Sequence, residues 1–90
     1  MAQHDLVVKL QETFDDFRLS APARRKVILP KIELICSMMQ ERGLSTHSAQ
    51  CCSRVVNTCR GMAKLKQPKA YDDSKQVSHV LGDISFINIE

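Results

Sequence analysis

The chain has 90 residues, of which 43% are hydrophobic and 26% charged, with a net charge of +3 and no Trp. These values predict one soluble globular domain over residues 1–90, near the small end of what folds around a single core. No apolar run approaches the ~20 residues that cross a bilayer, which excludes a membrane-spanning helix. Because the N-terminus lacks a signal-peptide layout, we expect a cytoplasmic protein whose four cysteines are free thiols.

Residues 4–18 repeat apolar side chains at three- and four-residue steps, which predicts a first amphipathic helix. Its stripe consists of Leu6, Val7, Leu10, Phe14 and Phe17. Asp5 near the beginning suits the positive end of the helix dipole.

A second helix is predicted over residues 21–42. Ser20 can cap it, and Pro22 is tolerated in a first turn because its missing N–H would be unpaired there. Pro30 lies inside the helix and predicts a kink or a break, since proline removes one helical hydrogen bond. Gly43 indicates a left-handed C-terminal stop. The stripe consists of Ile28, Ile32, Ile35 and Met39.

A third helix is predicted over residues 46–65, with Ser45 or Thr46 as its N-cap. Its stripe consists of Ala49, Cys52, Val55, Val56, Cys59, Met62 and Ala63. After a basic connector, Asp72 or Asp73 could cap a short fourth helix that ends at Gly82.

The final stretch, "ISFINIE", is predicted to be extended, with Ile84 and Phe86 on one side. The sequence therefore predicts an all-α domain of three main helices, a short fourth helix and an extended C-terminal tail. A core this small also favours pairing of two copies into a homodimer.

Three of the four cysteines fall within residues 47–62. Cys52 and Cys59 lie seven residues apart on the stripe of one helix, roughly 10 Å along its axis, too far for a disulfide or a shared zinc ion. We expect both to be core thiols. Cys51 is turned about 100° away and could react. His47 and Cys51 share a helix face, which leaves open a metal site or a nucleophile–base pair, although no zinc-type spacing accompanies them.

Charge is distributed unevenly along the chain. Residues 1–22 hold two basic and four acidic side chains (net −2), and residues 70–90 hold one basic and four acidic (net −3). Between them, residues 23–69 hold ten basic and two acidic side chains (net +8). Basic residues along a helix and its connector could follow a phosphate chain. The candidate nucleic-acid contacts are Arg24, Arg25, Lys26, Arg54, Arg60, Lys64, Lys66 and Lys69.

Two other readings of these charges remain open. Asp15 and Asp16 could neutralise the "RRK" run locally across the corner between the first two helices. The basic residues from Arg54 onward could form a solvated C-terminal helix face, which the dipole favours.

No catalytic motif is present, so we predict a non-enzymatic regulatory protein without a cofactor. Our first hypothesis is nucleic-acid-associated regulation of gene expression. The alternative is a helical protein–protein adaptor or inhibitor whose basic face binds an acidic protein partner.

The apolar tail is a further candidate for partner binding, through Ile84, Phe86, Ile87 and Ile89. It could pair with a second copy, add to a partner's sheet, or lie across the helices with Phe86 in the core.

Overall fold

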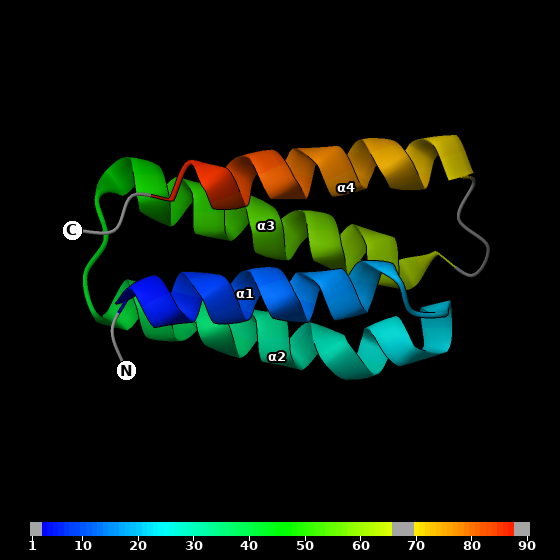
Figure 1. Cartoon of the computed structure of the whole chain (residues 1–90), viewed down its shortest axis with the longest axis horizontal. Helices are drawn as coiled ribbons and strands as arrows, with labels where there is room; N and C mark the ends of the chain where they lie inside the picture. Colours follow the sequence, from blue (N-terminus) through cyan, green and yellow to red (C-terminus); the bar gives the residue numbers. More distant parts are fainter. Residues whose placement is uncertain (1–2, 66–69, 88–90) are drawn as a thin grey trace.

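The computed structural model describes residues 3–65 and 70–87, and four helices account for most of them. These are α1 (Gln3–Arg18), α2 (Pro22–Glu41), α3 (Thr46–Lys64) and α4 (Ala70–Ser85). The chain runs up and down the bundle, so that each helix is antiparallel to the one before it (Figure 1). α1 packs on α2, α2 on α3, α3 on α4, and α4 back on α1. The predicted all-α bundle is confirmed.

One hydrophobic core fills the space between the helices. The predicted stripes of the first three helices all contribute to it, with Val7, Ala49 and Val56 only half-buried. Phe14 and Phe17 are fully buried, and their rings stack with centroids 6.0 Å apart. Because the chain has few aromatics, aliphatic and sulfur side chains fill the rest of the core.

Among the ends of α2 and α3, two predicted signals are confirmed and one is wrong. Ser45 caps α3, its Oγ accepting a hydrogen bond from the backbone N–H three residues on at 3.2 Å. Gly43 has a φ of +90°, the predicted left-handed stop. The prediction that Ser20 caps α2 is wrong. Its Oγ donates instead to the carbonyl of Asp16 at 2.6 Å, because the N-cap of α2 is one residue later, at Ala21.

α2 continues without a break through Pro30. Pro30 is exposed, whereas Ile28 and Ile32 on either side of it are buried in the core. Packing of these neighbours holds the helix together across the position where proline removes a hydrogen bond.

α4 is longer than predicted, at 16 residues, and equals α1 in length. The predicted end at Gly82 is wrong, because Gly82 does not adopt the left-handed backbone that would end the helix. Val80, Ile84 and Ile87 follow one another at helical spacing and are all buried. This face carries the helix beyond Gly82, so Ile84 and Ser85 are helical rather than extended.

Candidate interaction surfaces

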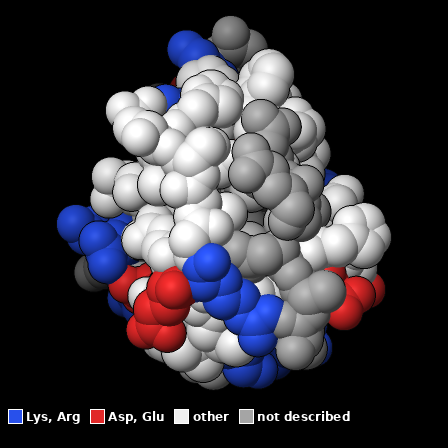
Figure 2. All heavy atoms as spheres, turned by 90° about the vertical axis from the view of Figure 1, so that its left-hand side faces the viewer, with Lys and Arg blue, Asp and Glu red and all other residues white. Residues whose placement is uncertain are grey.

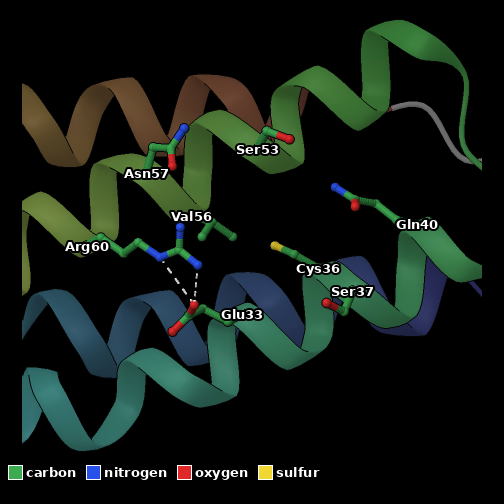
Figure 3. Close-up of a pocket in the computed structure, with 8 residues that line it drawn as sticks. All are labelled: Glu33, Cys36, Ser37, Gln40, Ser53, Val56, Asn57 and Arg60. Atoms are coloured by element: carbon green, nitrogen blue, oxygen red, sulfur yellow. Dashed lines mark hydrogen bonds and ion pairs between the residues drawn. The ribbon is translucent and has the colours of Figure 1, made fainter.

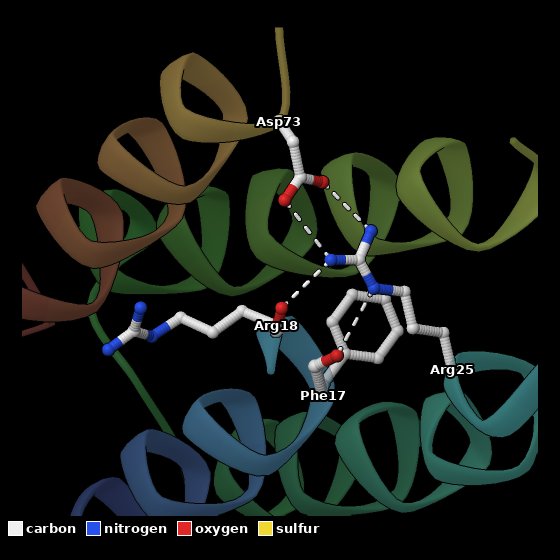
Figure 4. A network of polar contacts seen from close by, with 4 residues as sticks. All are labelled: Phe17, Arg18, Arg25 and Asp73. Carbon is white, nitrogen blue, oxygen red and sulfur yellow. Dashed lines mark hydrogen bonds and ion pairs between the residues drawn. The ribbon is translucent and has the colours of Figure 1, made fainter. Parts of the chain in front are cut away.

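Arg25, a predicted phosphate contact, is buried, with 3% of its surface exposed. Its Nη1 and Nη2 donate to the two carboxylate oxygens of Asp73 at 2.8 and 3.1 Å (Figure 4). Nε donates to the carbonyl of Phe17 at 3.2 Å and Nη2 to that of Arg18 at 2.9 Å. The guanidinium also lies 5.4 Å from the centroid of the Phe17 ring. Arg25 is thus enclosed by α1 and α4, which corrects its assignment to a phosphate-binding surface.

Three further arginines of the predicted surface are exposed but form ion pairs. Arg24 pairs with Asp16 at 3.3 Å, the local neutralisation expected at the α1–α2 corner. Arg54 pairs with Asp83 at 3.0 Å, and this hydrogen bond raises the pKa of the guanidinium. Arg60 donates twice to one oxygen of Glu33, at 2.6 and 3.2 Å. Each of these arginines is therefore matched with a carboxylate from another helix.

Two of the predicted contacts are exposed lysines without an ion pair to another described residue, Lys26 and Lys64. Since α2 and α3 are antiparallel, the first turn of α2 and the last turn of α3 lie at the same end of the bundle (Figure 1). Lys66 and Lys69 lie outside the described residues. The structure thus gathers part of the predicted basic surface at one end, with fewer unpaired charges than the sequence suggests.

A shallow groove of about 310 Å³ runs between α2 and α3 (Figure 3). The Arg60–Glu33 ion pair lies across it, and Cys36 points into it from α2. Its lining is mostly polar and consists of Glu33, Cys36, Ser37, Gln40, Ser53, Val56, Asn57 and Arg60.

All four cysteines are free and buried, which agrees with core positions for Cys52 and Cys59. A hydrogen bond with Cys52, together with burial, raises the pKa of Cys36, and the same bond lowers the pKa of Cys52. Burial raises the pKa of Cys59 to about 12. Within the described residues, no three His, Cys, Asp or Glu side chains come together as metal ligands.

Cys51 differs from the expectation that it could react, because it is also fully buried. Arg54 Nη2 donates to its sulfur at 3.3 Å, and Nε2 of His47 lies 3.9 Å from the same atom. The His47–Cys51 pair predicted from the spacing does exist, but the thiol is enclosed by its neighbours and has no surface open to a substrate.

The outer face of α2 carries an apolar stripe that we did not predict. Val27 and Leu34 are 65% and 61% exposed, and Ala23 and Pro30, also exposed, continue the stripe at three- and four-residue steps. We call these four residues the α2 outer stripe. The stripe could have been predicted from the sequence, because α2 contains more apolar residues than one buried helix face can hold.

Lysines flank the α2 outer stripe on both sides. At 100° per residue, Lys26 and Lys31 fall on opposite edges of it, roughly 70° from its centre. Both are exposed, and neither forms an ion pair with another described residue. The outer face of α2 is therefore an apolar strip between two positive charges.

Two of the four predicted partner-binding residues of the tail belong to the core rather than to an open surface. Ile84 and Ile87 are buried, which agrees with a tail that lies against the helices. Phe86, however, is 61% exposed, and its ring meets the edge of His47 with centroids 6.2 Å apart. The expectation that Phe86 fills the core is wrong, because Ile84 and Ile87 occupy the inward-facing positions. Ile89 lies outside the described residues.

The end of the bundle at which α4 finishes is shown in Figure 2. Charged side chains of both signs lie mostly in the lower half of this face, on the side of α1 and α2. Uncharged side chains cover most of the upper half. The described residues of this end therefore do not form one continuous basic surface.

The chain matches no protein-family model, no curated protein and no solved structure. None of the four helices, within the described part of the chain, combines the length and hydropathy that a membrane span requires.

Proposed function

We propose that this chain is a small non-enzymatic adaptor or inhibitor that binds an acidic protein partner through the outer face of α2. The observation that carries the proposal is the exposed apolar stripe between Lys26 and Lys31. Contiguous apolar surface rimmed by polar residues is typical of protein interaction sites. The two lysines add a preference for negative charge and would speed association.

Nucleic-acid binding has weaker support from the geometry. A phosphate backbone uses unpaired cations, whereas Arg24, Arg54 and Arg60 are each paired with a carboxylate and Arg25 is buried. Exposed Val and Leu side chains add little to phosphate recognition, and single strands are held mainly by stacking on aromatic side chains. The nucleic-acid hypothesis stays a prediction, which the following experiment also tests.

The experiment compares three forms of the full chain as bait in nuclease-treated extract of the native host. They are the wild type, the Lys26→Glu/Lys31→Glu variant, and a control with Lys9→Glu/Lys75→Glu. Lys9 and Lys75 are exposed on α1 and α4. Both double changes subtract four charge units, taking the net charge from +3 to −1. We expect a protein retained by the wild type and the control and lost by the α2 variant.

Equal retention by all three forms would contradict the proposed site on α2. Direct titration of the wild type with DNA and RNA at low salt tests the nucleic-acid hypothesis. Binding there that weakens steeply with added salt, together with a protein captured from untreated extract but absent after nuclease treatment, would favour the nucleic-acid hypothesis.

A further inference from the structure

We infer that the segment bound by this chain is an amphipathic helix with acidic side chains on both edges of its apolar face, lying along the α2 outer stripe. The inference rests on the proposed function and names the conformation and charge pattern of the partner. The length of the stripe, the arrangement of its lysines and the absence of a strand edge among the described residues all favour such a partner.

The α2 outer stripe has the spacing of one side of a helix–helix contact. Ala23, Val27, Pro30 and Leu34 span about 17 Å along the axis, roughly three turns. A second helix can place its own apolar residues at i, i+4 and i+7 against such a row, the usual pattern of helix recognition. An extended segment would need an unpaired strand edge for its backbone, and the described residues form no strand.

The lysines disfavour a second copy of this chain as the occupant. If two α2 stripes paired in parallel, Lys26 would face Lys31 of the other copy, and the like charges would oppose pairing. If they paired antiparallel about a two-fold axis, the same edges would meet, so each edge of the contact would carry two lysines. Glu33 lies on the Lys26 edge but already pairs with Arg60, so the antiparallel arrangement also leaves the lysines without a free acidic partner.

An acidic helix resolves this repulsion. Glu or Asp on the two edges of its apolar face would meet Lys26 on one side and Lys31 on the other. Because the stripe is only about three turns long, the interface is smaller than that of a stable dimer, and we expect reversible binding.

The test uses a synthetic helical peptide of about 18 residues, with leucines at three- and four-residue steps and glutamates on both edges. Its binding to the full-length chain is measured by fluorescence anisotropy. Two control peptides have the same length, one with each edge Glu replaced by Gln and one with the leucines replaced by Ser. We expect saturable binding of the first peptide, weakened severalfold by the Gln changes and lost with the Ser changes.

Chain variants locate the contact. Leu34→Glu should weaken peptide binding roughly tenfold to a hundredfold, because it places a charge within the stripe and beside the peptide's glutamates. Leu34 is exposed, so this change leaves the core intact, and circular dichroism checks the fold. The matched control is Leu65→Glu, another exposed leucine, 45% accessible and beyond the end of α3. It should leave binding unchanged.

The outcomes separate this inference from the proposed function. Peptide binding that Leu34→Glu and Leu65→Glu affect equally would overturn the helix site. So would a wild-type dimer in ultracentrifugation that Leu34→Glu converts to monomer. If the peptide fails to bind while the captured host protein still depends on Lys26 and Lys31, the helical partner is wrong and the adaptor function stands. Loss of that dependence contradicts the proposed site on α2 itself.

Discussion

Arg25 joins three helices although it carries a charge into the core. From α2, it donates to two carbonyls at the end of α1 and to both carboxylate oxygens of Asp73 in the first turn of α4. The last carbonyls of a helix have no partner within it, and Arg25 donates to two of them. The carbonyl of Phe17 also accepts from the backbone N–H of Ser20 at 3.2 Å. A buried ion pair contributes little compared with apolar packing, but removal of one partner leaves the other charge uncompensated.

Replacing Asp73 by Asn should therefore lower the free energy of unfolding by about 2–4 kcal/mol. The control is Asp72→Asn, which removes an acidic side chain from the same first turn of α4 at an exposed position. Urea denaturation at neutral pH measures both variants. Equal losses would mean that the helix dipole, rather than the contact with Arg25, accounts for the effect.

Because of Cys59, the free energy of unfolding depends on pH in the alkaline range. Burial raises its pKa from the usual 9.0 to about 12, so the native state resists loss of the thiol proton more than the unfolded chain does. A group with a raised pKa contributes stability that is fully present below pH 9.0 and is lost as the pH rises towards 12. The free energy of unfolding should fall over that interval, by at most about 4 kcal/mol from this thiol.

Cys59→Ala isolates this contribution, because the wild type and the variant differ in no other ionisable group. The variant should be less stable at pH 7, where it leaves a small cavity, and should lose less stability between pH 9 and pH 11. Parallel pH profiles for the two proteins would mean that Cys59 ionises as readily in the native state as in the unfolded chain.

α2 is the element with two apolar faces. Its inner face, with Ile28, Ile32 and Met39, fills the core, and the α2 outer stripe meets solvent. Pro30 lies on the outer stripe, where it removes a backbone hydrogen bond without contributing to the core. An exposed proline inside a helix is costly for folding, so its presence here favours a role for this face outside folding.

The Pro30→Ala variant should accordingly be more stable than the wild type, by about 1–3 kcal/mol. Alanine restores the N–H that can bond to the carbonyl of residue 26 and has the highest helix propensity. Thermal unfolding followed by circular dichroism measures the change. A destabilised variant would show that the proline ring makes packing contacts that alanine cannot replace.

Sequence periodicity was sufficient for the first three helices, because their stripes and most of their stops are local features. Ser45 and Gly43 act within a few residues of where they stand. The sequence predicts the wrong end for α4, because Gly82 is a local stop signal whereas burial of Ile84 and Ile87 depends on other helices. The surroundings of the candidate phosphate contacts were less predictable than the helices. Arg25 finds its carboxylate 48 residues away, and no spacing in the sequence pairs it with Asp73 rather than with Asp15 or Asp16.

The molecule as a whole is a ring of four helices in which chain neighbours pack together and α4 closes onto α1. The contacts of α1 with α2 and of α2 with α3 join segments linked by short turns. Closing α4 onto the first half of the chain orders a much longer stretch, which costs more conformational entropy. Small helical bundles dominated by such local contacts fold rapidly.

The Arg25–Asp73 ion pair joins α2 to α4, so it can form only when α4 docks. Removing it therefore shows whether α4 docks before or after the folding transition state. If α1, α2 and α3 assemble first, the pair forms on the native side of the folding barrier. Asp73→Asn should then leave the refolding rate nearly unchanged and speed unfolding, by on the order of a hundredfold for a loss near 3 kcal/mol. Stopped-flow refolding and unfolding across a urea series measures both arms, and refolding slowed by a similar factor would place α4 in the transition state. If α4 docks last, the unfolding rate of the native bundle is set by the contacts that hold α4 on the other helices. Asp73 would then stabilise the protein mainly by slowing unfolding.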